Sequence, residues 1–399
     1  MKKTTATCLS LTSALMSWLP QYSLGQETPS PVAGGDGGGV VELPQVVLEE
    51  IARCGSPFDA HLHLEAQWFP PDNAQPLLAE MTASGIDQGI LMAIVRLSFF
   101  EYNTNWEAVK DDELTRMKTY LEMDGFVAVK LAPPHTRLAM NSTIICDILQ
   151  EVSQSSKPIV AIHIGTTPFC GPFGDFILGQ RGLCTPEFVD PFYLEDYIST
   201  YSNVTFVMMH GGQDFDDGTS GDVPFYNGEL FDHSLDLMGK YENIVLEISA
   251  MLATEAPDDA SYRNPLAFEN LLKVVEAGMQ ERTIYGSDAN QFPGGIISYL
   301  ISTVNSLIAA KFSEEERCRI LVDFPKEVYN IPEANVSTPS VAPVGTPSSS
   351  ASTSTTMPSD HGLSTSAPTL HPTLTAGSIT ALPNPVSVVI LALTLALQT

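Results

Sequence analysis

Asp59-Ala60-His61-Leu62-His63 places two histidines two residues apart, directly after a short apolar run, Pro57-Phe58. Side chains two residues apart on a β-strand point to the same side of the sheet. The imidazoles of His61 and His63 can therefore converge on one ion. The stretch predicts a strand that ends in a chelating pair.

Three later segments share this design, since each is a short β-branched run that ends in a polar side chain. They are 158–163, which ends in His163, 204–210, which ends in His210, and 282–288, which ends in Asp288. Parallel α/β barrels carry their chemistry at the carboxyl ends of the strands. A single histidine at a strand end can equally be a hydrogen-bonded core residue. Four such segments in order predict one metal centre.

Residues 56–331 alternate between strand-like and helix-like segments. The segments with strand character are 57–62, 88–95, 126–131, 159–163, 204–210, 244–248 and 283–286. The amphipathic segments of helix length are 74–84, 106–123, 142–155, 191–201, 231–241, 265–277 and 293–311. This alternation predicts βα units that build a parallel sheet.

The order of the motifs resembles the amidohydrolase-related family of metal-dependent hydrolases and decarboxylases. The motifs are HxH, a histidine after an apolar strand, His-Gly-Gly from His210 and Gly-Ser-Asp up to Asp288. The resemblance covers about 56–331 and implies a TIM-type (β/α) barrel. Such a barrel has eight strands, one more than the sequence shows. We expect either a barrel abbreviated by one βα unit, between Arg96 and the strand of Lys130, or a strand that the pattern hides.

The resemblance also implies the roles of the site residues. The metal ligands would be His61, His63, His163 and Asp288, and one zinc ion suits imidazole with carboxylate, with manganese or iron as alternatives. His210 would act as the acid/base beside a metal-activated water, whose pKa Asp288 helps to set, because an imidazole pKa of about 6.5 lies close to neutral pH. Alternatively, His210 is a further ligand or orients one.

Two basic residues are candidates for substrate binding. Lys130 resembles a strand-end lysine that some relatives carboxylate to bridge two metals, and that mononuclear relatives keep as a pocket residue. Arg96 could hold a substrate carboxylate in its planar fork, or it could face the surface. Glu247 would be an inward-facing carboxylate if its apolar neighbours face the helices. The substrate would be a small organic acid, amide or lactone.

The two ends of the chain carry targeting signals. Residues 1–25 combine Lys2 and Lys3 with an apolar stretch and small residues before the cleavage point, which predicts a secretory signal peptide. Residues 26–55 lead into the barrel. The segment 332–376 is rich in Ser, Thr and Pro and predicts a disordered, O-glycosylated stalk.

Residues 377–399 predict a GPI-attachment signal, with Ala376 as the attachment residue. As a helix, the apolar run 386–397 would cover about 18 Å, which is too short for a hydrocarbon core of about 30 Å. We therefore expect the protein in the secretory pathway and on the outer face of the plasma membrane. Secretion without an anchor and a short tail anchor are the alternatives.

Composition fits this location and excludes one class of partner. The formal net charge of −28 argues against nucleic-acid binding, which needs clustered Lys and Arg. Cys170 and Cys184 bracket a glycine-rich stretch and are the expected disulfide in an oxidising compartment. The expected N-glycosylation sites, Asn141, Asn203 and Asn335, follow the acceptor pattern. A homodimer is left open.

Two classes of function compete. The first is a metal-dependent enzyme, and the second is a catalytically inactive, GPI-anchored cell-surface binding protein on the same scaffold. Retention of all four ligand positions favours the enzyme, because a binding protein does not need them. Hydrolysis and decarboxylation use the same ligands, so the fold alone does not choose between them.

Overall fold

The computed structural model describes residues 43–63, 75–92, 99–172, 174, 181–215, 221–250, 266–289, 295–331 and 392–396. They belong to one compact unit, formed by Met1–Ile331 and Val386–Thr399. The predicted signal peptide and stalk lie outside the described residues, as do Arg96, Asn335 and Ala376. No helix in the described ranges is long and apolar enough to cross a membrane.

The seven strands that the sequence predicts are all present, with ends displaced by a few residues. They are β1 (Phe58–His63), β2 (Gln88–Met92), β3 (Val129–Leu131), β4 (Ile159–Gly165), β5 (Thr205–Gln213), β6 (Ile244–Ile248) and β7 (Thr283–Tyr285). Strands β3 to β7 form one parallel sheet in chain order, and β1 pairs in parallel with β2. The prediction of a parallel sheet built from βα units is confirmed.

Strand β1 follows β7 in space and so connects the two sheets. Leu62 and Ala289 form a parallel bridge, and the backbone N–H of His63 donates to the carbonyl of Ala289 at 2.7 Å. The backbone N–H of Asp288 donates to the carbonyl of His61 at 2.8 Å. The parallel strands therefore follow one another in the order β2-β1-β7-β6-β5-β4-β3.

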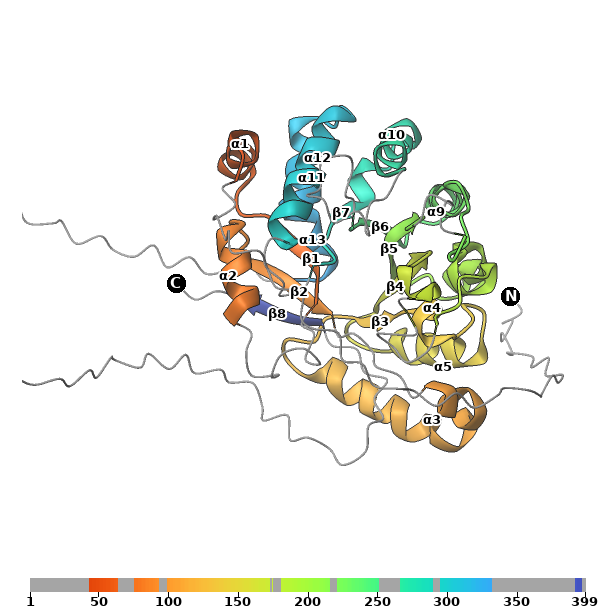
Figure 1. Cartoon of the computed structure of the whole chain (residues 1–399). Helices are drawn as coiled ribbons and strands as arrows, with labels where there is room; N and C mark the ends of the chain where they lie inside the picture. The colour runs from red at the N-terminus through yellow and green to blue at the C-terminus, as the bar shows by residue number, and fades with distance from the viewer. Residues whose placement is uncertain are drawn as a thin grey trace, which may run out of the picture. The chain divides into compact units, whose positions relative to one another are not determined.

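The sheet does not close into a complete barrel within the described part of the chain. No hydrogen-bonded ladder joins β2 to β3 there. The connection between them carries the long helix α3 (Phe99–Glu122), which packs against α5 (Thr143–Val152) on the outside (Figure 1). This opening lies where the sequence is one βα unit short. The closed eight-stranded barrel that the resemblance implies is therefore not seen in the described residues, whose seven parallel strands form an open sheet.

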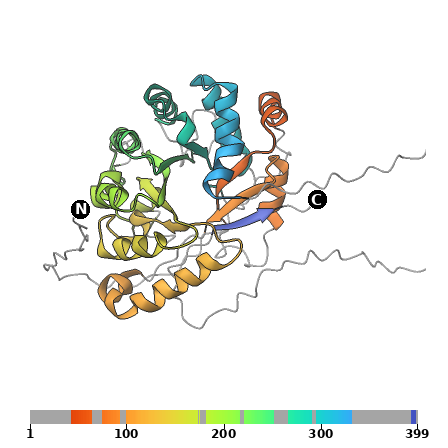
Figure 2. The ribbon, with the colours of Figure 1, turned by 180° about the vertical axis from the view of Figure 1, so that it is seen from behind.

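A strand from the end of the chain lies at this opening. β8 (Ala392–Ala396) pairs antiparallel with β2, with Gln88 opposite Ala396 and Met92 opposite Ala392 (Figure 2). It uses the edge of β2 that faces away from β1. β8 falls within 377–399, the segment predicted to be a GPI-attachment signal.

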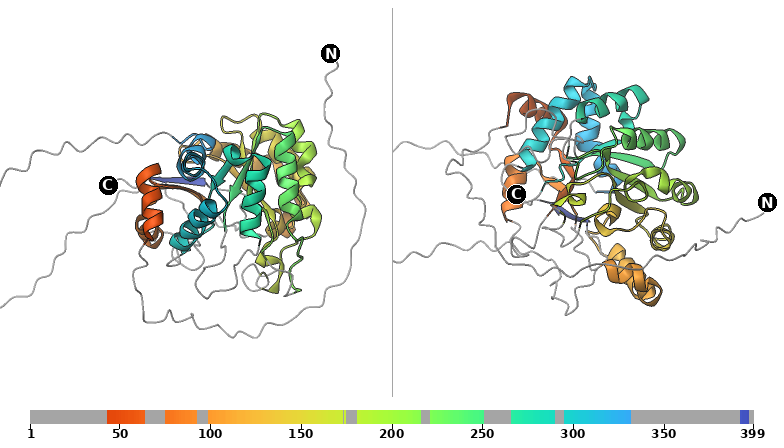
Figure 3. Two further views of the ribbon diagram at one scale, coloured as in Figure 1. Left: turned by 90° about the horizontal axis from the view of Figure 1, so that it is seen from above. Right: turned by 45° about the vertical axis from the view of Figure 1, so that its right-hand side comes forward.

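Four further helices lie outside the strands. They are α2 (Gln75–Ala83), α9 (Glu229–Lys240), α10 (Ala267–Ala277) and α11 (Gly295–Ala309), and they contact one another in the order α2, α11, α10, α9 (Figure 3). The shorter helices are α4 (Pro133–Thr136), α7 (Pro186–Val189), α8 (Glu195–Thr200), α12 (Glu314–Cys318) and α13 (Phe324–Val328). The sequence did not predict α12, α13 or α1 (Gln45–Cys54), which lies in the lead-in.

The two faces of the sheet bury different clusters, because successive side chains on a strand point to opposite sides. On β4, Val160 and Ile162 belong to the large cluster that includes the outer helices. Ile159 and Ala161 belong to a smaller cluster, here called the inner cluster, with residues such as Val207, Met209, Val245 and Ile284. His163 follows Ala161 by two residues, and Glu247 follows Val245 by two, so both side chains lie on the same face of the sheet as the inner cluster. The polar site therefore lies on the inner face, at the carboxyl ends of the strands.

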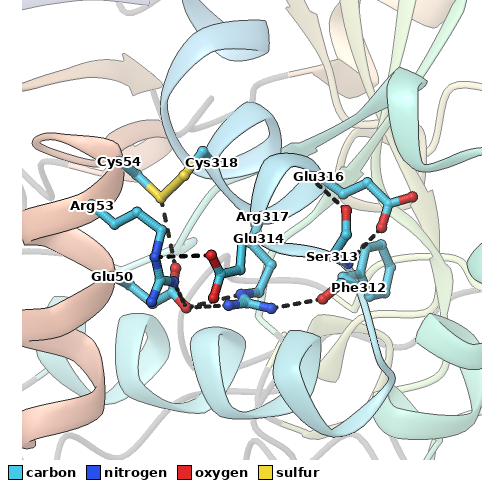
Figure 4. Close-up of a disulfide and its surroundings, with 9 residues drawn as sticks. All are labelled: Glu50, Arg53, Cys54, Phe312, Ser313, Glu314, Glu316, Arg317 and Cys318. Carbon is cyan, nitrogen blue, oxygen red and sulfur yellow. Dashed lines mark hydrogen bonds and ion pairs between the residues drawn. A yellow bond between two sulfur atoms is a disulfide. The ribbon is translucent and has the colours of Figure 1, made fainter.

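Two disulfides join pairs of cysteines within the described residues. Cys54 and Cys318 join α1 to α12 across 264 residues, a bond that the sequence did not predict (Figure 4). Beside it, buried Arg317 donates through Nε to Glu50 Oε1 at 2.9 Å, and Arg53 pairs with the same carboxylate. Cys170 and Cys184 form the second bond, across 14 residues, and this is the pair that the sequence indicates.

Candidate metal centre

A β-bulge turns the two histidines of β1 toward the inner face. Asp59 pairs with Gly89 and Leu62 with Leu91, so β1 contains one residue more than β2 over this stretch. Within this irregular stretch, Ala60 belongs to the inner cluster, and the adjacent His61 has its Nδ1 3.2 Å from Ser249 Oγ. Bulges commonly re-aim side chains beside functional sites.

His61, His63 and Asp288 bring three ligand atoms together. His61 Nε2 lies 3.0 Å from His63 Nε2 and 3.1 Å from Asp288 Oδ1, and His63 Nε2 lies 3.0 Å from Asp288 Oδ1. Two ligand atoms held about 2.1 Å from an ion are about 3.0 Å apart at an angle of 90° and about 3.4 Å apart at the tetrahedral angle. The triangle is therefore close to the size of a divalent metal site.

The outer nitrogen of each ring has a hydrogen-bond partner. His63 Nδ1 lies 3.1 Å from the carbonyl oxygen of Met92, which can only accept, so this nitrogen carries a hydrogen. His61 Nδ1 lies 3.2 Å from Ser249 Oγ. Metal-ligating histidines usually hold their second nitrogen in this way. The Nε2 of His63 is then left with a lone pair that points into the triangle.

The electrostatics of the triangle favour a metal cation over a proton. If both Nε2 atoms carry lone pairs, these and the carboxylate oxygen repel one another at 3 Å unless a positive charge lies among them. Burial lowers the pKa of His61 well below its ordinary value, so a protonated ring is disfavoured. Burial alone would raise the pKa of Asp288, but its charged neighbours and the bond to His63 outweigh it, and the net shift is downward. The donor set therefore fits a divalent ion.

His210 lies next to the triangle and outside it. Its backbone is in the left-handed region at φ 62, as is that of Asp288 at φ 61, a conformation that non-glycine residues adopt mainly where the surroundings impose it. Its ring centroid lies 5.1 Å from that of His61, and its Nδ1 lies 2.8 Å from Ser249 Oγ. Burial lowers the pKa of His210 to about 4, below the near-neutral value expected from the sequence, so the ring is neutral at pH 7.

The structure does not bring His163 into the triangle. Its Nε2 lies 3.4 Å from the carbonyl oxygen of Thr166, and its ring packs between His210 at 4.4 Å and His135 at 4.8 Å. Within the described residues, the three-residue groups that could hold a metal near the site are His61, His63 and Asp288, and His61, His210 and Glu247. Ligation by His163 thus stays a prediction.

Lys130 places a buried amine in the same region. Its Nζ lies 2.5 Å from Met209 Sδ, and no carboxylate of the described residues lies within ion-pair distance of it. Burial lowers the pKa of Lys130 and raises that of Glu247, because each charged form loses hydration. The second predicted substrate residue, Arg96, lies outside the described residues.

The sequence did not indicate two residues of the site, Ser249 and His135. Ser249 follows the anticipated inward carboxylate Glu247 by two residues, so strand alternation could have identified it. His135 lies on α4, where its Nε2 is 3.0 Å from Thr167 Oγ1 and its ring contacts Phe169. His135 follows the strand of Lys130 closely in the sequence, and this position at the carboxyl end of a strand could have indicated it. Five of the eight histidines of the chain gather here, since His61, His63, His163 and His210 lie beside it.

The predicted disulfide and glycosylation residues lie away from this centre. Cys170 and Cys184 are bonded to each other in the segment after β4. Asn141 and Asn203 are both exposed. The Nδ2 of Asn203 donates to the carbonyl of Ser153 at 2.7 Å.

Comparisons with known proteins agree with the resemblance to the amidohydrolase-related family. The amidohydrolase family matches residues 108–331, more than half of the chain. Among solved structures, the chain is similar to an amidohydrolase from Burkholderia multivorans with bound zinc, at 15% identity and a TM-score of 0.42, covering 69% of this chain and 99% of that one. It is also similar to a 5-carboxyvanillate decarboxylase from Novosphingobium aromaticivorans complexed with manganese, at 12% identity and a TM-score of 0.40, covering 74% and 98%.

No curated protein matches the chain. The assignment rests on the sequence match, which extends from α3 to the end of the compact unit and includes His163, His210 and Asp288. The HxH pair precedes the matched range, and the structure places it against Asp288 within it. The chain therefore belongs to the amidohydrolase family of metal-dependent hydrolases and carboxy-lyases.

Proposed function

We propose that this chain binds one zinc ion through His61, His63 and Asp288, with His163 as a fourth ligand, and hydrolyses or decarboxylates a small organic acid, amide or lactone. The observation that carries the proposal is the convergence of two imidazole Nε2 atoms and a carboxylate oxygen within 3.1 Å of one another. Imidazole and carboxylate together suit zinc, with manganese or iron as alternatives. A zinc ion bound here would polarise a carbonyl and lower the pKa of water toward about 7.

His210 is the proposed acid/base. Its ring is buried and neutral at pH 7, and its Nδ1 is engaged by Ser249. Its Nε2 is then the nitrogen that can take a proton during water attack and return it to the leaving group. Positioned acid/base groups of this kind typically contribute about 10²- to 10⁴-fold in rate.

The buried amine of Lys130 favours an anionic substrate. Burial disfavours the protonated amine, and Asp288 and Glu247, whose charges favour it, lie beyond ion-pair distance. A substrate carboxylate would supply a negative charge within that distance, and Arg96 is the second proposed contact. Phe169 and Phe215, which contact His135 and His210 edge-on, would pack against the apolar part of such a substrate.

We also propose that the enzyme passes through the secretory pathway and is displayed on the cell surface by a GPI anchor. The two disulfides support an oxidising compartment. Two acceptor sequons begin at exposed asparagines, Asn141 and Asn203, where an oligosaccharyltransferase can reach them. The predicted signal peptide, 1–25, supports entry into the secretory pathway, and the predicted GPI-attachment signal, 377–399, supports the anchor.

Metal analysis of the purified protein, followed by a screen of acids, amides and lactones, tests the proposed function. We expect close to one zinc-like ion per chain, and loss of that ion in the double variant His61→Ala, His63→Ala. His233→Ala is the matched control, because His233 stacks on Phe192 outside the site. Unchanged metal content in the double variant would refute the site. Metal binding without turnover would instead favour the surface binding protein.

A further inference from the structure

Ser249 lies directly after β6 and is fully buried between three polar side chains. Its Oγ is 2.7 Å from Glu247 Oε2, 2.8 Å from His210 Nδ1 and 3.2 Å from His61 Nδ1. A serine hydroxyl has one hydrogen to donate and two lone pairs to accept with. Three partners therefore use the full hydrogen-bonding capacity of this one oxygen.

The direction of each hydrogen bond follows from the chemistry of the partners. Glu247 Oε2 already accepts from the backbone N–H of His210 at 3.0 Å, so it also acts as the acceptor toward Ser249. The hydroxyl hydrogen of Ser249 then points to Glu247, and only its lone pairs remain for the two rings. Each ring must present Nδ1–H to Ser249. Its Nε2 is left with a lone pair.

We propose that Ser249 is a positioning residue that holds His61 and His210 in the same tautomer, with the hydrogen on Nδ1. The Nε2 of His61 is thereby free to bind a metal ion, and the Nε2 of His210 is free to accept a proton. The inference deepens, and rests on, the metal-dependent function proposed above. One hydroxyl thus couples a ligand on β1 to the acid/base on β5 through β6.

Substitution of Ser249 tests the proposal with two measurements that do not need a substrate. Nitrogen-15 NMR of histidine side chains distinguishes Nδ1–H from Nε2–H, and competition with a chelator measures the zinc dissociation constant. In the metal-free wild type, both rings should carry the hydrogen on Nδ1, with signals assigned through His61→Gln and His210→Gln. In Ser249→Ala, both rings should show mixed tautomers, and zinc should bind about 10- to 100-fold more weakly.

Two further variants separate this role from the general loss of a buried hydroxyl. Ser234 is equally buried, but its Oγ donates only to the carbonyl of Leu230 within α9, at 3.2 Å. Ser234→Ala should leave the tautomers and the zinc affinity unchanged. Ser249→Thr keeps the hydroxyl and should show the wild-type tautomers.

The outcomes for this proposal and for the proposed function are distinguishable. Hydrogen on Nε2 of either ring in the wild type would overturn the role of Ser249, whether or not any variant folds. A folded Ser249→Ala protein with unchanged tautomers and zinc affinity would also overturn it, and the metal site would still stand. A wild type that binds no metal, yet carries both hydrogens on Nδ1, would refute the function and support the tautomer assignment.

Discussion

His63 and Met92 are joined by a hydrogen bond of 3.1 Å between the ring Nδ1 and the backbone carbonyl oxygen. The two residues are also register partners on β1 and β2, so the sheet itself supplies the acceptor. A backbone acceptor cannot lose its lone pairs by mutation or titration. The orientation of His63 is therefore built into the strand pairing, whereas the orientation of His61 depends on the side chain of Ser249.

Asp288→Asn should lower metal affinity while preserving the fold. The amide is nearly isosteric with the carboxylate, but it is neutral and binds a cation more weakly. We expect a loss larger than the approximately 10- to 100-fold that the removal of an outer partner costs. Elemental analysis and chelator competition measure this, with melting temperature as the check on folding. Full metal content at limiting zinc would show that Asp288 is not a ligand.

His210→Asn should separate acid/base chemistry from metal holding. If the ring only moves protons, the variant keeps its metal and loses about 10²- to 10⁴-fold in turnover. Metal content and rate are measured on the same preparation, with His233→Asn as the control. Loss of the metal as well would make His210 a ligand. Full activity would remove it from the mechanism.

The metal-free protein should lose stability in acid partly through His135. Burial lowers the pKa of His135 to about 3, and its ordinary value is 6.5, so the fold holds the ring neutral. Its contribution to stability is present above about pH 6.5 and is lost as the pH falls toward about 3, because only the unfolded chain takes up the proton. His135→Gln should therefore have a melting temperature that falls less than the wild type's between pH 7 and pH 5. An equal fall in both would contradict this linkage.

The two disulfides should differ in their contribution to stability. The Cys54–Cys318 bond spans 264 residues and the Cys170–Cys184 bond spans 14. A disulfide lowers the conformational entropy of the unfolded chain, and it does so more when it closes a longer segment. Replacing Cys54 and Cys318 by serine should cost about 2–5 kcal/mol of unfolding free energy, and replacing the shorter pair should cost less. Chemical denaturation of both double variants provides the comparison. The reverse order would show that local strain or residual structure dominates.

Short-range patterns in the sequence predict most of the strands and some of the residues of the metal centre. Alternation locates the strands, and the HxH spacing identifies His61 and His63. The bulge in β1 is different, because an extra residue becomes visible only when β1 is paired with β2. The bond between Ser249 and His61 spans 188 residues, and the bond between Cys54 and Cys318 spans 264. No local pattern encodes contacts of that range, whereas the missing ladder between β2 and β3 lies where the sequence is one βα unit short.

The tail of the chain gives the last prediction, because β8 and a GPI-attachment signal cannot both be present in the mature protein. β8 pairs with β2 over Ala392–Ala396, within the 377–399 segment that a transamidase would remove. If the tail is a signal, a GPI-specific phospholipase should release the protein from cells, and mass spectrometry should find no peptide from 392–396. Deleting 386–399 should then give a secreted protein whose melting temperature equals that of the released enzyme. Leu393→Asp is the matched control, since it keeps the length, breaks the apolar run and should abolish display. A mature protein that retains 392–396, and that melts at a lower temperature after the deletion, would show instead that the tail is a structural strand at the open edge of β2.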